Sequence, residues 1–288
     1  MLFGNSFRVA MRGLLINKTR SFLALLGIII GIGAVITITA LAEGLTVTVE
    51  KQVDEMGTNL VFVVPSMSRN ESRSQQARRG YAQMTFFNDR EIRAIEAGLS
   101  VSAMISRNVQ SEATVSRGRD SQYIPVAGID EFYEKIYNYS LHTGRMPSPN
   151  EITGGKRVTV LGYQTAKDLF GNDEPLGQNV SINGNRFEVV GVLGEVGGGV
   201  GTNPNKIALV PLRVAQITLF GMGDKVLYLV IKAEKMQDVE VVKDDAHRAM
   251  TRVRRIDDPD DENFQVMTQT DALESFGQFV NVLTMVLG

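Results

Sequence analysis

The stretch SFLALLGIIIGIGAVITITALA, residues 21–42, contains no charged residue and is bounded by Arg20 and Glu43. At about 1.5 Å of rise per residue, a helix of this length spans roughly 33 Å, enough to cross the hydrocarbon core of a bilayer. The stretch therefore predicts a transmembrane helix, which separates a short N-terminal flank from a long C-terminal region.

Two other interpretations of residues 21–42 stay open. A buried core helix of a large protein can be apolar on every face, but such helices are usually shorter and carry polar caps. A cleaved signal peptide is the second, because Ala40-Leu41-Ala42 has the small-x-small form of a cleavage site. The apolar run is, however, longer than the usual 7–15 residues or so of a signal peptide, and about twenty residues precede it.

The flank before the apolar stretch carries Arg8, Arg12, Lys18 and Arg20 and no acidic residue. The positive-inside rule then predicts a cytoplasmic N-terminus, with everything after Glu43 on the other side of the membrane. Apolar residues recur at helical spacing in residues 1–20, which predicts an amphipathic helix with Arg8 and Arg12 at the cytoplasmic membrane surface. An ordinary basic flank with incidental periodicity is the alternative.

Composition limits the remaining possibilities. The chain has 288 residues, a formal net charge of −2 and no Cys. The charge gives no reason to expect a nucleic-acid partner. About 230 residues lie between the apolar ends, enough for one large domain or two modest ones. A core of that size can form without disulfides, so the lack of Cys permits an oxidising compartment without identifying it.

Local signals predict alternating strands and helices in the C-terminal region. Asn88 and Glu91 match a capping box, which predicts a helix over residues 88–97. Asn183-Gly184 is a strong signal for a two-residue hairpin between strands 180–182 and 186–192. Further strands are expected at 59–65, 102–110, 112–116, 122–127, 157–161, 206–211, 226–232 and 264–267, and further helices at 163–170 and 236–254.

This order of elements predicts an α+β fold in which an N-terminal transmembrane helix precedes a two-lobed extracytoplasmic domain over residues 43–273. We expect a mixed α/β lobe near the membrane, made of residues 43–110 and 225–273. A β-rich lobe, residues 111–224, is inserted into it. The polar segment 66–80 and the glycine-rich segment 194–205 are expected to be loops.

Motifs for catalysis, cofactor binding and metal binding are not found. The glycine cluster Gly197–Gly201 lacks the Gly-Lys-Ser/Thr ending of a phosphate-binding loop, so we do not expect this chain to hydrolyse ATP by itself. Two histidines, His142 and His247, have no nucleophile motif beside them. The acidic stretch 257–262 does not fit an EF-hand, and we interpret it as a solvated loop compensated by neighbouring arginines.

Gly27 and Gly31 are four residues apart within the apolar stretch. This small-xxx-small arrangement allows two membrane helices to approach closely. Glycine is also common in membrane helices without a packing role, so both interpretations stay open.

Residues 158–193, VTVLGYQTAKDLFGNDEPLGQNVSINGNRFEVVGVL, resemble the external domain of MacB/FtsX-type ABC transporter permeases. The resemblance rests on Val-Leu-Gly at 160–162, Leu-Phe-Gly at 169–171, Pro-Leu-Gly-Gln at 175–178, Asn-Gly at 183–184 and Val-Gly-Val-Leu at 190–193. Residues 17–44 are also similar to the family's first membrane segment, and residues 56–65 to its first external strand. The resemblance therefore covers most of the chain.

The resemblance implies a permease with four membrane helices and a large external domain between the first and the second. Residues 274–288, which include the uncharged run FGQFVNVLTMVLG, would then begin the second membrane helix. Implied partners are a separate cytoplasmic ABC ATPase subunit and a second permease, either identical or related. A periplasmic adaptor protein and membrane lipid are further candidates. The implied mechanism is mechanotransmission in a bacterial inner membrane, in which ATP hydrolysis moves the external domain.

Two other classes of function compete with the permease. A single-pass, membrane-anchored periplasmic binding or sensor module would use the same layout. A periplasmic hydrolase held by an uncleaved anchor is the third class, although no catalytic set supports it.

Overall fold

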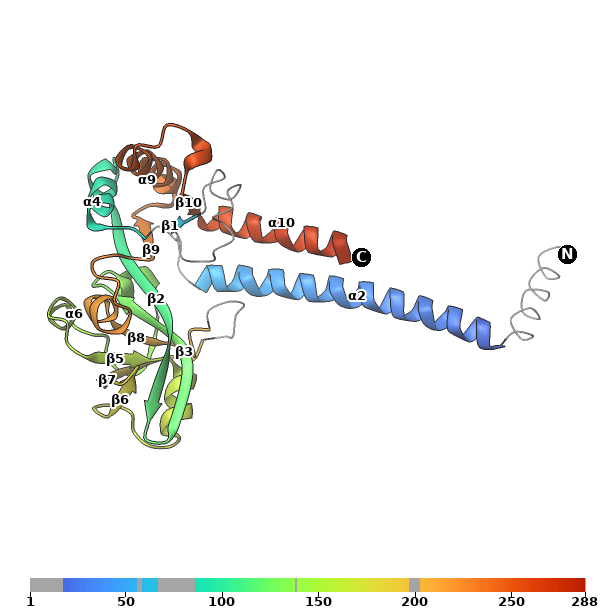
Figure 1. Cartoon of the computed structure of the whole chain (residues 1–288), viewed down its shortest axis with the longest axis horizontal. Coiled ribbons are helices and arrows are strands. Elements are labelled where there is room, and N and C mark those ends of the chain that lie inside the picture. The colour runs from blue at the N-terminus through green and yellow to red at the C-terminus, as the bar shows by residue number, and fades with distance from the viewer. Residues whose placement is uncertain (1–17, 56–58, 67–85, 138, 197–202, 288) are drawn as a thin grey trace. The chain divides into compact units, whose positions relative to one another are not determined.

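The computed structural model describes residues 18–55, 59–66, 86–137, 139–196 and 203–287 (Figure 1). The chain divides into two compact units, one formed by Met1–Thr48 with Glu274–Gly288 and the other by Val49–Leu273. Residues 1–17, which contain most of the predicted amphipathic helix with Arg8 and Arg12, lie outside the described residues. The same is true of residues 67–80 of the predicted polar loop and of the glycine cluster Gly197–Gly201.

The described residues of the first unit are helical. Helix α2 runs from Lys18 to Glu55 without interruption, so it continues well beyond the end of the predicted span at Ala42. One of its hydroxyl groups is bonded within the helix, where Thr37 Oγ1 donates to the carbonyl oxygen of Gly33 at 2.7 Å. A second long helix, α10, runs from Gln269 to Leu287 and contains most of the predicted start of a second membrane helix.

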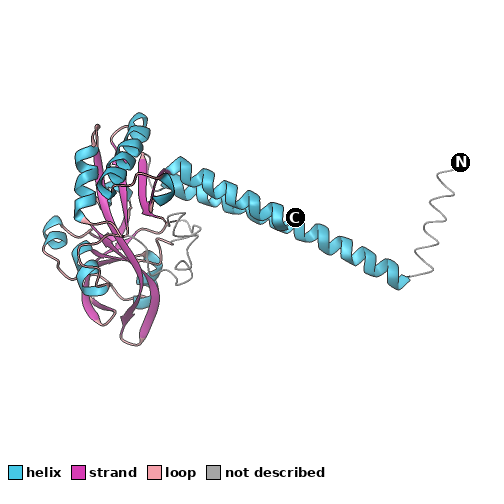
Figure 2. Cartoon of the chain, turned by 45° about the horizontal axis from the view of Figure 1, so that its top comes forward, coloured by secondary structure: helices cyan, strands magenta, loops and turns pink. Residues whose placement is uncertain are grey.

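The second unit is built on one mixed sheet, whose strand order is β10-β1-β9-β2-β3-β8-β5-β7-β4, with β6 pairing with β2 and β7. Figure 2 shows these strands in magenta with helices around them. The strands are β1 Leu60–Pro65, β2 Ala103–Arg117, β3 Asp120–Ile129, β4 Leu141–Gly144, β5 Val158–Leu161, β6 Asn179–Ile182, β7 Asn185–Leu193, β8 Ala208–Pro211, β9 Tyr228–Ala233 and β10 Phe264–Thr268. The α-helices are α4 Asp89–Gly98, α5 Tyr133–Tyr137, α6 Pro149–Thr153, α7 Tyr163–Phe170, α8 Leu212–Val214 and α9 Val239–Arg254. The mixed α/β character predicted for the domain is confirmed.

Strand β2 joins the two halves of the sheet. Residues 103–108 pair with β9, whereas residues 109–117 pair with β3. The prediction of two separate strands, 102–110 and 112–116, is wrong, because β2 is continuous through Ser111 and Glu112. Both of these polar side chains are exposed although consecutive residues point to opposite faces of a strand, so the ladder with β3 and not burial keeps β2 continuous here.

The strongest local signals are confirmed. The Asn88 side chain accepts from the backbone of Glu91 at 3.1 Å, and the Glu91 carboxylate accepts from the backbone of Asn88 at 2.8 Å, which completes the capping box of α4. Asn183 and Gly184 both have positive φ, 46° and 79°, and connect β6 to β7 as predicted. Helix α7 has the predicted bounds and ends at Gly171, with φ 60°.

The hydrophobic core extends across the sheet. One buried cluster contains Ile92 of α4, Ile105 of β2, Phe187 of β7 and Met250 of α9. Helix α9 packs against α4 and against strands β1, β9 and β10. The predicted lobe boundaries near residues 110 and 225 stay a prediction, since this core and β2 connect both halves.

Candidate functional site: the junction of the sheet with the terminal helices

Among the residues that the structure describes, one helix segment, Lys18–Ile38, is long and apolar enough to cross a membrane. Its mean hydropathy is 2.6 and none of it is buried within the chain. Side chains such as Ile28 and Ile30 are 60% and 62% exposed. Burial within this chain therefore does not account for the apolar surface, which argues against the core-helix interpretation. Since a signal sequence has the same length and composition near an N-terminus, that alternative stays open.

Gly27 and Gly31 lie on this segment. A Cβ atom added to either glycine would meet no other atom within 4 Å. Neither glycine is therefore needed for close packing within the described part of the chain, and a role between chains stays a prediction.

The two connections between the sheet and the long helices leave from neighbouring strands. Strand β1 follows α2 after a short segment, and β10 continues directly into α10. The two strands pair antiparallel, with Val61 opposite Thr268 and Pro65 opposite Phe264. The two connections therefore reach the sheet at adjacent strands.

Helix α10 begins with a reciprocal cap. The backbone nitrogen of Thr268 donates to Asp271 Oδ2 at 2.9 Å, and that of Asp271 donates to Thr268 Oγ1 at 3.1 Å. The same Asp271 oxygen lies 2.7 Å from Lys243 Nζ on α9. This hydrogen-bonded ammonium lowers the pKa of Asp271, and Asp271 in turn raises the pKa of Lys243. Sequence analysis missed this joint, although the Thr-x-x-Asp pattern at 268–271 resembles a capping box.

Helix α9 is in turn bound to α4. The carboxylate of Asp245, which is 4% exposed, accepts from the backbone and hydroxyl of Ser100 at 2.8 and 2.6 Å. At the C-terminal end of α9, Arg254 Nε lies 2.7 Å from Glu91 Oε1 in the first turn of α4. The two helices are thus held by polar contacts at both ends of their interface.

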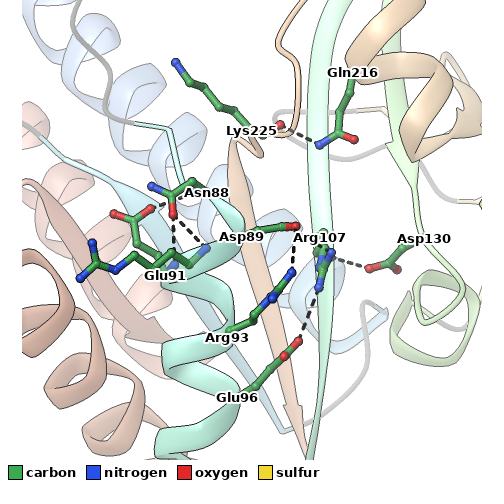
Figure 3. Close-up of polar contacts among 10 residues, drawn as sticks. Asn88, Asp89, Glu91, Arg93, Glu96, Arg107, Asp130, Gln216 and Lys225 are labelled. Atoms are coloured by element: carbon green, nitrogen blue, oxygen red, sulfur yellow. Dashed lines mark hydrogen bonds and ion pairs between the residues drawn. The ribbon is translucent and has the colours of Figure 1, made fainter.

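Arg107 connects α4 to β2, as Figure 3 shows. Its guanidinium lies 3.4 Å from Asp89 and 3.6 Å from Glu96, both on α4. Its backbone nitrogen donates to Asp130 at 2.6 Å. All four residues line a cavity of about 540 Å³ that Gln216 also borders.

Asp130 is the buried acid of this cavity. It is 5% exposed and accepts further hydrogen bonds from the Ser106 hydroxyl at 2.8 Å and the Phe132 backbone at 3.2 Å. Burial raises its pKa, although these hydrogen bonds oppose the shift. Across the cavity, the side chain of Gln216 donates to the carbonyl of Lys225 at 2.9 Å, from a π-helical turn at Ala215–Leu219 (Figure 3). π-helical turns are often found at functional sites.

The described residues contain no group of three or more His, Cys, Asp or Glu side chains that could hold a metal ion. His247 forms a pair with Glu262 at 3.0 Å, and the ring of His142 lies edge-on to Tyr163.

The model of the MacB-like periplasmic core domain family matches residues 21–249. The macrolide export ATP-binding/permease protein MacB of Chlorobium luteolum is 25% identical over 97% of this chain and 41% of its own length. The uncharacterized ABC transporter permease YknZ of Bacillus subtilis is 25% identical over 98% of this chain and 68% of its own length. The present chain thus spans about two fifths of the MacB relative.

Solved structures show the same fold. The periplasmic region of MacB from Actinobacillus actinomycetemcomitans superposes with a TM-score of 0.60 at 17% identity and covers 79% of this chain and 96% of that structure. The family match extends over most of the chain, from the apolar helix to α9. The chain therefore belongs to the MacB-like periplasmic core domain family of ABC transporter permeases.

Proposed function

We propose that this chain is the permease subunit of an ABC-type export or mechanotransmission system, in which ATP hydrolysis by a separate ATPase moves the periplasmic domain. The pairing of β1 with β10 supports it, because both connections to the apolar helices leave from adjacent strands. Force on either connection then reaches the sheet at one place.

Side-chain contacts would transmit this force from α10 through α9 and α4 to the sheet. Helix α10 is continuous from its cap at Thr268, and Lys243 of α9 holds Asp271 in its first turn. The contacts of α9 with α4, and of α4 with Arg107, extend the route to β2. Coupling in this sense requires an element with two states that both ends bias. We propose the α9–α10 joint as that element.

The placement in the cell is part of the same proposal. The basic flank with Arg8 and Arg12 holds the N-terminus in the cytoplasm, next to the ATPase, and the domain lies outside the inner membrane. Gly27 and Gly31 pack against a second permease, identical or related, in the lipid. A periplasmic adaptor protein is a further partner. A separate ATPase is consistent with YknZ, whose name describes a permease alone.

A membrane-anchored binding or sensor module is the second candidate. The observation in its favour is the cavity of about 540 Å³ beside Arg107, which falls in the usual size range of ligand sites. Such a module would bind its ligand without any response to an ATPase.

Because the chain contains no Cys, spin labels can be introduced on single added cysteines. We would label the exposed positions Asp244 of α9 and Gln278 of α10, reconstitute the chain with its ATPase in nanodiscs and measure the label–label distance. ATP with vanadate should shift this distance. An unchanged distance with an active ATPase would reject the coupling and favour the binding module.

The joint itself is tested by Lys243→Met. This variant should broaden the distance distribution and reduce the ATP-dependent shift, because Asp271 loses its partner on α9. Glu240→Gln is the matched control, since Glu240 lies farther from the Lys243 ammonium, at 3.5 Å, and its side chain is 70% exposed.

A further inference from the structure

Four arginines line the groove between α4 and α9. Arg90 belongs to α4, Arg248 and Arg252 belong to α9, and Arg255 follows directly as the C-cap of α9; we call these four residues the arginine groove. The volume of the groove is about 560 Å³. Its remaining lining consists mainly of small or apolar residues: Ala94, Ala97, Gly98, Ala249 and Val253.

The bottom of the arginine groove carries no large side chain where α4 and α9 pack closely. A Cβ atom added to Gly98 would lie 3.0 Å from the Cβ of Ala249, so no larger side chain rises between α4 and α9 at this point. The long arginine side chains then form the walls of an open, shallow channel.

Within its own lining, the groove has four arginines and a single acidic residue. Its one acidic residue is Asp245, which is 4% exposed and already accepts from Ser100 and from Arg248. In the part of the chain that the structure describes, Arg90, Arg252 and Arg255 form no ion pair with an acidic side chain. The formal charge of the whole chain is −2, so this concentration of arginine is not a consequence of a basic protein.

The charges follow a line rather than a point. Arg248 and Arg252 are spaced i and i+4 on one face of the last two turns of α9, and Arg255 follows as the C-cap three residues later. They extend over roughly 10 Å of helix axis. A single small anion would meet one or two of these guanidinium groups, whereas an elongated polyanion with similar spacing meets all of them.

Arg255 adds an independent observation. Its backbone is left-handed, with φ 55° and ψ 48°, at a helix end where glycine or asparagine is usual. Such strain in a residue with a Cβ is a reason to look for a function of its side chain. Here the strained residue lines the end of the arginine groove and also a neighbouring pocket that contains Asp257, Asp258 and Asp261.

We propose that the arginine groove binds an acidic, helical segment of a partner protein that presents carboxylates at i, i+4 and i+7. The small residues of the floor let the partner's backbone lie close to α4 and α9, and the walls supply bidentate donors for its carboxylates. The inference rests on the proposed function only in placing that partner on the same side of the membrane as the domain.

The test uses the full chain in phosphatidylcholine nanodiscs and a fluorescein-labelled, alanine-based helical peptide of about 14 residues with glutamates at that spacing. Fluorescence anisotropy should show binding that weakens with salt, and no binding of a peptide with lysines in place of the glutamates. Arg252→Gln should weaken binding about fivefold or more. Arg119→Gln, an exposed arginine in the β2–β3 turn, should leave it unchanged.

Arg255→Gly separates binding from folding. Glycine relieves the left-handed strain, so the thermal midpoint should stay constant or rise, while peptide affinity falls about fivefold or more. Equal affinity of wild type, Arg252→Gln and Arg255→Gly would overturn the proposal. It would also be overturned if phosphatidylglycerol vesicles bound through these arginines and the peptide did not. Neither binding experiment includes the ATPase. A negative result here therefore does not reject the proposed coupling, which the spin-label distances test separately.

Discussion

Arg254 of α9 and Glu91 of α4 form an ion pair across the helix interface, with 2.7 Å between Nε and Oε1 and with side chains only 8% and 9% exposed. Glu91 also caps α4, and the Arg254 guanidinium lies 5.1 Å from the ring centre of Phe87. Two segments separated by 163 positions in the chain are thus joined by one buried charge pair.

Removal of one partner should be costly, because it leaves the other charge buried. We expect Arg254→Met to lower the free energy of unfolding by about 3–5 kcal/mol, measured by urea titration. The double variant Glu91→Gln with Arg254→Met should lose less than the sum of the single variants. Additive losses would show that the two side chains act independently.

Glu151 makes stability depend on pH. Two hydrogen bonds from Arg145, at 2.7 and 2.9 Å, and two from Ser148 lower the pKa of Glu151 to about 2. A carboxylate with a lowered pKa stabilises the fold above its unfolded pKa of about 4.3, and this contribution is lost as pH falls toward 2. At pH 7 the free energy of unfolding of the wild type should exceed that of Glu151→Gln by about 2 kcal/mol. Arg145 is more than half exposed, so solvent screening makes this difference smaller than the pKa shift alone would give.

The measurement is urea unfolding of both chains between pH 7 and pH 2.5, where the difference should shrink steadily below pH 4.5 or so. The matched control is Glu134→Gln, which removes a carboxylate from an exposed position of α5. A constant difference for Glu151→Gln would contradict the role of its ionisation.

Gly128 of β3 is required by close packing. A Cβ atom at this position would lie 2.5 Å from the Cβ of Ala215 and 2.6 Å from Val109 Cγ2. Gly128→Ala should therefore cost about 1–3 kcal/mol of stability. Gly98→Ala, whose nearest contact is 3.0 Å, should cost less, and the reverse order in thermal midpoints would refute this explanation.

The cap of α10 should control local opening of that helix. Thr268→Val removes the hydroxyl that accepts from the backbone nitrogen of Asp271. This should lower the free energy of local opening by about 1 kcal/mol, which corresponds to amide exchange about fivefold faster over residues 269–273. Hydrogen–deuterium exchange of the chain in nanodiscs measures this. Thr270→Val changes an exposed neighbour and should leave the exchange rates unaltered.

The two glycines of the apolar helix can be tested for association between chains. Gly27→Ile or Gly31→Ile should weaken self-association in nanodiscs about fivefold, measured by energy transfer between labelled chains. Gly33 lies on a different face of the same helix and is the control. Unchanged energy transfer in all three variants would mean that both glycines are merely tolerated there.

Sequence reasoning succeeded where the signal was local. Asn88 with Glu91, and Asn183 with Gly184, each lie within a few residues of one another, and their backbone geometry follows from their own chemistry. Contacts between distant residues gave no such signal. Lys243 with Asp271 and Arg107 with Asp130 are brought together only when the sheet forms, so the α9–α10 joint and the cavity were not predicted.

The continuity of β2 shows the same limit from another side. Polar Ser111 falls between the two predicted strands, yet the pairing partners on β3 keep the strand intact. Residue propensities along one segment carry no information about the strands that will pair with it. Those neighbouring strands decide whether a polar residue lies in a turn or in a continuous strand.

The position of β1 has a consequence for biosynthesis. This strand ends at Pro65, but both of its partners, β9 from Tyr228 and β10 from Phe264, are synthesised only after most of the domain. The apolar stretch LVFVV of β1 therefore stays without its strand partners while most of the domain is synthesised, and its backbone groups are not yet paired in the sheet. Late closure of so distant a pairing slows folding, and it makes the nascent chain dependent on protection against aggregation during export.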